Sequence, residues 1–261
     1  GDRPILMLAG EMVLGGKQNR ILREDLLLPA SGRLELPVLC VERRRWSGPG
    51  AAFKSNVAIA ALNVRAAAST HQDQEAVWKG VSYYQAALRV SSPTEDLQAV
   101  QDSPEVREAV ADYVEGFRKH WRPDTVGMVV ARHGRIVGVD VFCNAALFRK
   151  HRDRILESYA VDCYVAHRRL RASGRAWREL VPDRREAERF LRRTLRAHHE
   201  WRATPGAGRL LGVSGAGLRG TGLVYRQALL HASLFAEDQV ITPPVPLPRP
   251  ILRRSPQRRL E

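Results

Sequence analysis

The strongest chemical signal in this sequence is a short polar segment that follows a pair of glycines. Gly15 and Gly16 precede two cations and two amides, which are Lys17, Gln18, Asn19 and Arg20. Lysine supplies a point charge, arginine supplies a planar fork of donors, and the amides can both donate and accept. The glycines allow a close backbone approach. The segment is therefore predicted to bind an anion such as a phosphate group.

A second set of side chains has the chemistry for acid–base or nucleophilic work. Cys40 and Glu42 alternate along a run that reads as a strand, so they are expected to share one face. A carboxylate and a thiol beside cations can act as general base and nucleophile. The predicted catalytic residues are Glu11, Cys40, Glu42 and His231. The predicted ligand-binding residues are Lys17, Gln18, Asn19, Arg20, Arg45 and Trp46.

An ordinary structural interpretation of the same residues stays open. The segment from Lys17 to Arg20 also fits a polar turn, and Glu42 also fits a surface partner of Arg43 to Arg45. Trp46 would then cover the sheet. His231 lies in an apolar strand-like run, where a histidine commonly serves as a hydrogen-bonded structural residue.

Three further motifs lack the context that their usual chemistry needs. Gly215 to Gly220 matches G-x-G-x-x-G, but a hairpin is expected to follow, where a dinucleotide site needs a helix N-terminus. Close strand packing or a bulge explains these glycines better. The pair His198 and His199 has no second ligand at metal-site spacing, and Ser214 lacks the glycine that begins a nucleophile elbow. No metal site and no cofactor are predicted.

The net charge of +14 is concentrated in one part of the chain. Residues 1–148 hold 18 Lys or Arg against 17 Asp or Glu, whereas the block from Arg149 to Arg202 holds 16 against 8. Such a block is compatible with a nucleic-acid interface and also with solvated helix faces. Because the first half is nearly neutral, Lys17 and Arg20 call for a local explanation.

The pattern of elements indicates an α+β fold. Strands are expected at Ile5–Leu8, Arg20–Leu28 and Arg33–Glu42, and again at 125–131, 135–142, 209–213, 218–225 and 228–235. Helices are expected at Gln72–Val90, from Ser103-Pro104 onward, along 155–170 and from Asp183 through His198 or His199. The Ala-rich run Ser55–Ala68 fits strand or helix. The two β-rich ends should form mostly antiparallel sheet, with helices packed between and against them.

Composition sets expectations for organisation and location. We expect one domain over 1–242, lacking a natural N-terminal part because the chain begins at Gly1, and a disordered Pro/Arg-rich tail over 243–261. Three cysteines without paired spacing argue against a disulfide framework, and no apolar run reaches the roughly 18 residues of a membrane span. A cytoplasmic protein without membrane contact is expected. The oligomeric state is not predicted.

Several spaced motifs resemble the ARPP domain family of bacteria, over about nine-tenths of the chain. They are Gly10-Glu11, Gly16 to Arg20, Pro37-Val38 with Cys40 to Glu42, Arg45-Trp46, Val77-Trp78, Val139 to Phe142, and Gly220 to Leu223 followed by His231 and Phe235. Arg43 and Arg44 replace the small residue usual before Arg-Trp, and the N-terminal portion of the domain is absent.

The resemblance implies a link to ADP-ribose or NAD metabolism, because the family is named for its association with ADP-ribosylglycohydrolases and rhodanese-phosphatase proteins. The first hypothesis is thus a protein that binds or processes an ADP-ribose-like phosphorylated nucleotide, with Lys17 and Arg20 on the phosphates. The second is a basic nucleic-acid or protein-binding module without catalysis. The third is a scaffold whose polar opening stabilises the fold.

Overall fold

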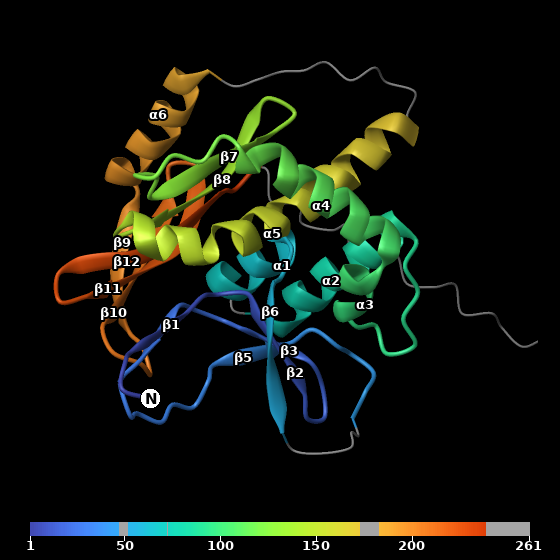
Figure 1. The fold of residues 1–261 in the computed structure, drawn as a ribbon, viewed down its shortest axis with the longest axis horizontal. Coiled ribbons are helices and arrows are strands. Elements are labelled where there is room, and N and C mark those ends of the chain that lie inside the picture. The colour runs from blue at the N-terminus through green and yellow to red at the C-terminus, as the bar shows by residue number, and fades with distance from the viewer. Residues whose placement is uncertain (47–51, 72, 173–182, 239–261) are drawn as a thin grey trace, which may run out of the picture.

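The computed structural model describes residues 1–46, 52–71, 73–172 and 183–238, and the tail predicted from 243 onward lies outside them. Antiparallel strands occupy both ends of the chain and helices lie between them (Figure 1), which confirms the predicted α+β fold. Within these ranges, no helix is long and apolar enough to cross a membrane.

The N-terminal part forms two small sheets. Strand β1 (Ile5–Met7) pairs with β4 (Leu26–Leu28), and a four-stranded sheet has the order β5 (Val38–Cys40), β3 (Arg20–Leu22), β2 (Glu11–Gly15) and β6 (Phe53–Ile59). The long strands expected at 20–28 and 33–42 are wrong in extent. The first is interrupted where the buried Asp25 turns inward and accepts the Ala9 N–H at 2.8 Å. The second begins only after Pro37, which has no N–H for a strand ladder.

The Ala-rich run contains both a strand and a helix, so neither simple alternative was right. Strand β6 leads into α1 (Leu62–Ala66) and then into one turn of π-helix, η1 (Ala67–His71). Helices α2 (Gln74–Leu88), α3 (Gln98–Asp102) and α4 (Pro104–Arg118) follow. Asp73 caps α2 through the Glu75 and Ala76 N–H groups, and Pro104 opens α4 as predicted.

The C-terminal part is one antiparallel sheet with helices on both faces (Figure 1). Its order is β7 (Gly127–Arg132), β8 (Arg135–Phe142), β12 (Ala228–Ala236), β11 (Leu218–Tyr225), β10 (Arg209–Gly215) and β9 (His198–Ala203). Helix α5 (Ala145–Ala172) packs Phe148, Ile155 and Tyr159 on one face. Helix α6 (Arg184–Arg193) packs Phe190 on the other face.

The expected helix from Asp183 through His198 or His199 is wrong in its last turns. Helix α6 ends at Arg193, a 3-10 turn covers Thr194–Arg196, and His198 begins β9. The pairing of β9 with Arg209–Ser214 of β10 provides the backbone hydrogen bonds that a longer helix would have supplied. This edge strand could not be seen from helical spacing alone.

The glycine-rich segment connects β10 to β11, and the predicted hairpin of β11 and β12 follows it, where a dinucleotide site would need a helix. Gly215 pairs with Leu218, and no helix follows. A Cβ at Gly220 would lie 2.0 Å from the Ser233 carbonyl oxygen on β12. Gly220 is therefore required by the close approach of two strands.

The substitution Gly220→Ala should lower the free energy of unfolding by roughly 2–4 kcal/mol, because the strands β11 and β12 must separate to admit the methyl group. Gly116→Ala is the matched control, since nothing lies within 4 Å of its added Cβ on α4. That control should gain up to about 1 kcal/mol from helix propensity. Urea denaturation measures both, and equal effects would contradict the packing argument.

Candidate functional site

The segment from Lys17 to Arg20 forms a turn whose two amides serve the fold. The Gln18 side chain is buried and donates to the Glu42 carbonyl oxygen at 2.8 Å. The Asn19 backbone N–H donates to the Glu42 carboxylate at 3.0 Å, and the Asn19 amide donates to Asp96 at 2.8 Å. These residues therefore lie close together, as their spacing in the sequence suggested. Their amide groups form hydrogen bonds with other residues of the protein.

Arg45 completes this turn network. Its Nε lies 2.8 Å from Glu42 Oε1, and Nη1 donates to the Gly16 carbonyl oxygen at 2.8 Å. Burial favours the neutral form of Glu42, but the hydrogen bonds from Arg45 and the Asn19 N–H outweigh it and lower the Glu42 pKa. Burial raises the pKa of the neighbouring Asp96 to about 6. Glu42 is thus held as a charged partner of Arg45.

The other residues predicted near this turn are more exposed or differently placed. Lys17 is exposed, and Trp46 is 69% exposed, so Trp46 does not cover the sheet. The guanidinium of Arg20 lies over the Phe53 ring at 5.6 Å. Burial raises the pKa of the Cys40 thiol, which reduces its thiolate fraction at neutral pH.

Glu11 and His231 lie apart from that turn, in a second polar group beneath α5. Glu11 forms an ion pair of 3.0 Å with Arg154, whose Nη2 lies 2.6 Å from His151 Nδ1. Burial raises the Glu11 pKa despite Arg154, while burial and the Arg154 charge lower the His151 pKa to about 4. His151 stacks on Phe142, which in turn contacts His231. The predicted site residues therefore divide between two places.

His231 bridges two buried carboxylates. Its Nδ1 lies 2.7 Å from Asp25 Oδ2 and its Nε2 lies 3.2 Å from Asp140 Oδ1. Asp140 also receives hydrogen bonds from Ser233 and Tyr159, and both terminal nitrogens of Arg65 lie 3.1 Å from its oxygens. These side chains are at most 3% exposed. Sequence reasoning missed Arg65 because it is the single cation in an Ala-rich run that read as core.

The charges in this group stabilise one another. Burial would favour a neutral His231, but Asp25 and Asp140 outweigh it and raise the His231 pKa to about 9. Burial would likewise raise the pKa of Asp140, but Arg65 and His231 hold it well below its usual range. The imidazolium therefore donates from both nitrogens at neutral pH.

A row of residues links this buried group to the open end of the same sheet face. Strand pairing places Asp140 opposite Ser233, Ser233 opposite Thr221, Thr221 opposite Gly212, and Gly212 opposite Glu200. Directly opposed residues of antiparallel strands project to the same face. The row therefore runs across the sheet from the core beneath α5 to the edge strand β9.

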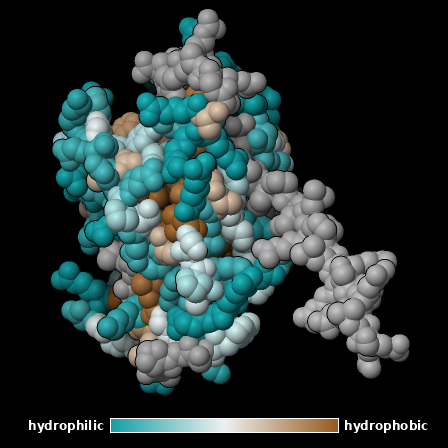
Figure 2. Space-filling view, turned by 90° about the vertical axis from the view of Figure 1, so that its right-hand side faces the viewer, coloured by the Kyte–Doolittle hydropathy of each residue, from teal (hydrophilic) through white to brown (hydrophobic). Residues whose placement is uncertain are grey.

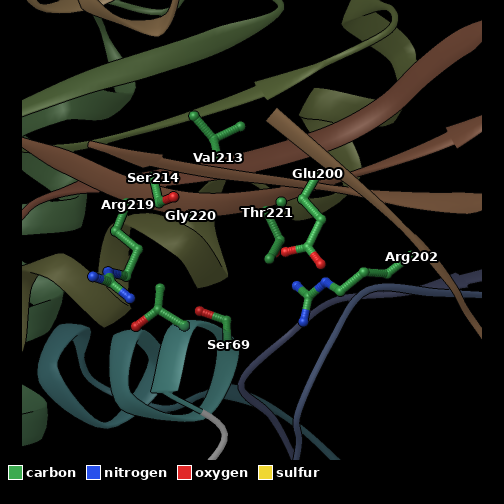
Figure 3. Close-up of a pocket in the computed structure, with 10 residues that line it drawn as sticks. Ser69, Glu200, Arg202, Val213, Ser214, Arg219, Gly220 and Thr221 are labelled. Carbon is green, nitrogen blue, oxygen red and sulfur yellow. The ribbon is translucent and has the colours of Figure 1, made fainter. Parts of the chain in front are cut away.

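A polar pocket of about 120 Å³ lies at the open end of this row, between η1 and strands β9 to β11. In Figure 3 the side chains of Arg219, Thr221, Glu200 and Arg202 project from the strands toward the helix that carries Ser69, whereas Val213 points away. Thr70 and Ser214 also line the pocket. The Ser69 hydroxyl donates to the Arg65 carbonyl oxygen at 3.0 Å, so the pocket wall is tied to the buried ion pair.

Two arginines and several hydroxyls make this pocket suited to an oxyanion. Arg202 Nε is buried and has no hydrogen-bond partner within the described ranges. Arg219 donates from Nε to Glu237 at 3.2 Å. Sequence reasoning missed this site, although its glycine-rich motif marked Gly220 and Thr221, because the register of β9 and the position of η1 are needed to assemble it.

Among the described residues, no three His, Cys, Asp or Glu side chains lie close enough together to hold a metal ion. The chemistry available in the pocket is therefore that of guanidinium groups, hydroxyls and one carboxylate, Glu200. Such a set can bind and orient an anionic ligand.

We expect the free energy of unfolding to fall as the pH rises from about 7 to 9.5, with a steep contribution from His231. Its folded pKa of about 9 exceeds the unfolded value near 6.5, so its stabilisation is complete below about 6.5 and is lost as pH rises through about 9. This shift in the His231 pKa corresponds to a loss of at most on the order of 3 kcal/mol in the free energy of unfolding. The interaction of His231 with Asp140 is already included in that value. Urea denaturation at several pH values measures it.

In His231→Gln the free energy of unfolding should change less between about pH 7 and 9.5. The glutamine amide can still form hydrogen bonds, but it does not titrate. His199→Gln is the control, because His199 is exposed at the sheet edge. An unchanged slope in His231→Gln would show that His231 is neutral in the folded protein.

Of three comparisons with known proteins, one found a match. Searches of curated proteins and of solved structures found no match. The model of the family described as "ARG and Rhodanese-Phosphatase-superfamily-associated Protein domain" matches residues 1–235. Among the residues on which the resemblance rested, Asp140 and His231 lie in the buried group, and Gly220 and Thr221 line the pocket. The chain therefore belongs to the ARPP-1 family.

Proposed function

We propose that this protein binds a phosphorylated nucleotide of the ADP-ribose or NAD class, with a phosphate group in the pocket between η1 and strands β9 to β11. The observation that carries the proposal is the pair Arg202 and Arg219 facing hydroxyls across one concave site. Guanidinium groups recognise phosphate oxygens through paired N–H donors. The family's association with ADP-ribosylglycohydrolases supplies the class of nucleotide.

The hydrogen bonds that the two arginines have available support this role. Arg202 Nε is a buried donor without a partner in the described residues, and an unmade buried hydrogen bond is costly. Arg219 uses Nε on Glu237, which leaves the two terminal nitrogens for a ligand. A bound phosphate would satisfy both side chains.

The size of the pocket favours recognition of one end of the nucleotide. Its volume of about 120 Å³ is well below the roughly 300–1,000 Å³ typical of sites that enclose a drug-sized ligand. A phosphate with part of its ribose fits such a space, and the adenine would lie outside. Ribose 5-phosphate should therefore bind in the pocket, while adenosine should not.

Processing of the nucleotide would need a proton donor or acceptor near the bound sugar. Glu200 is the carboxylate among the pocket residues that the structure describes. The catalytic roles predicted for Glu11, Cys40, Glu42 and His231 stay predictions, as do the ligand-binding roles of Lys17, Gln18, Asn19, Arg20, Arg45 and Trp46.

Isothermal titration with ADP-ribose tests the proposal and separates the two candidate places. We expect Arg202→Ala and Arg219→Ala each to weaken binding about tenfold or more, because each removes a charge-assisted hydrogen bond to phosphate. Lys17→Ala and the exposed control Arg184→Ala should leave affinity unchanged; the Arg184 side chain is 92% exposed.

Two results would count against this assignment. Loss of binding in Lys17→Ala with normal binding in Arg202→Ala would move the site to the turn at Lys17. No heat of binding at millimolar ADP-ribose and millimolar NAD would remove this class of ligand altogether.

A second candidate function is nucleic-acid binding, and it is favoured by where the basic block exposes its charge. On α5, Arg154 pairs with Glu11 and Arg168 pairs with Glu105. The exposed arginines are concentrated on and just after α6, namely Arg184, Arg185, Arg189, Arg192, Arg193 and Arg196. We propose α6 as the surface that would contact a phosphate backbone.

If α6 binds nucleic acid, the affinity for a single-stranded RNA oligomer should fall steeply with salt, and Arg192→Glu with Arg193→Glu should abolish it. Fluorescence anisotropy at 50 and 200 mM salt measures this. Arg135→Glu with Arg226→Glu is a matched charge change away from α6, since Arg135 begins β8 and Arg226 lies in the turn between β11 and β12. Equal losses in both double variants would reveal only a general charge effect.

A further inference from the structure

A second cavity, of about 380 Å³, lies between α3, α4, α5 and the end of β6, away from the proposed phosphate pocket. Its walls combine polar side chains with apolar ones, among them Val106 and Val110 from α4 and Val161 from α5. Helices α3 and α4 lie on the right-hand side of Figure 1, and this side faces the viewer in Figure 2. Apolar surface is visible there between hydrophilic side chains. The cavity is large enough for a small organic molecule.

Two of the polar side chains that line this cavity, Gln101 and Glu157, offer hydrogen-bond acceptors. Gln101 donates from Nε2 to the Ile59 carbonyl oxygen at 3.3 Å, so its Oε1 is the atom left over, and that atom is buried without a partner in the described residues. Glu157 lines the same cavity; its side chain is partly buried, and the charges of Arg154 and Arg118 act on its carboxylate. A buried acceptor such as Gln101 Oε1 requires a donor.

The charge of the lining differs from that of the whole protein. Two carboxylates, Asp102 and Glu157, line the cavity with one guanidinium, Arg107, in a chain of net charge +14. Burial raises the pKa of Glu157, with a further contribution from Asp153. A cation placed beside Glu157 would favour its charged form.

We propose that this cavity binds a small organic amine, whose ammonium group donates to Gln101 Oε1 and the Glu157 carboxylate and whose apolar body packs on Val106, Val110 and Val161. The three valines exclude water from the apolar body, and the two acceptors select the ammonium group over a hydroxyl or a carboxylate. The site is separate from the pocket that contains Arg202 and Arg219, and its occupancy does not depend on the proposed nucleotide ligand.

Titration of the protein with three probes of one shape tests this inference. Benzylamine, benzyl alcohol and benzoate are added in turn, and the methyl resonances of Val106, Val110 and Val161 are followed by NMR. We expect benzylamine to shift these resonances and to bind about tenfold more tightly than benzyl alcohol, because it makes a charge-assisted hydrogen bond. Benzoate should not bind.

Variants on two helices make the test specific. Glu157→Gln should reduce benzylamine to the affinity of benzyl alcohol, whereas Glu108→Gln, an exposed carboxylate on α4, should have no effect. Ala111→Phe at the exposed rim should block benzylamine and benzyl alcohol alike while leaving the melting temperature unchanged.

Three results would overturn the inference: no probe shifts the valine methyls, benzylamine and benzyl alcohol bind equally, or Glu157→Gln binds benzylamine normally. ADP-ribose binding is measured separately on Arg202→Ala, so failure here leaves that proposal untouched.

Discussion

The buried ion pair between Arg65 and Asp140 is the contact on which the rest of this structure depends. Two parallel hydrogen bonds of 3.1 Å join the side chains, and the Arg65 guanidinium also lies over the rings of Tyr159 and Phe235. A buried charge left without its partner costs roughly 3–5 kcal/mol. The pair therefore fixes helix α1 against strand β8, and through His231 it also fixes β12 and the segment around Asp25.

Other features of the fold follow from making room for this pair and holding α1 in place. A Cβ at Gly10, where φ is +86°, would lie 2.8 Å from Arg65 Cγ, and one at Gly138 would lie 2.7 Å from the Tyr159 hydroxyl. Asp162 of α5 holds the start of α1 by accepting the Leu62 N–H at 2.8 Å. The π-helix η1 continues directly from α1 and carries Ser69 and Thr70 to the pocket. The position of the candidate site is thus set by the buried charges behind it.

The polar residues near the N-terminus show how one set of residue types supports two interpretations. Gln18, Asn19, Glu42 and Arg45 do lie together, as their spacing suggested, but they bond mainly to one another. Their hydrogen bonds join the turn between β2 and β3 to the segment that follows β5. Arg202 and Arg219, by contrast, looked like ordinary members of a basic sequence, yet they face a concave surface. Residue type gave the chemistry of both groups, and only the contacts distinguish a structural network from a pocket.

The sequence by itself determined the fold class, the main helices and the C-terminal strands, because apolar spacing, helix caps and turn residues act over a few neighbouring positions. It also marked the family through motifs such as Val139–Phe142 and Gly220–Leu223. It could not assign the ends of the strands near Asp25 or the edge strand at His198–Ala203, because these depend on pairing with distant segments. The tertiary structure alone decided that Arg65 meets Asp140 across 75 residues and that η1 faces β9 to β11. The physical reason is that buried charges and strand registers are selected by partners that no local pattern reveals.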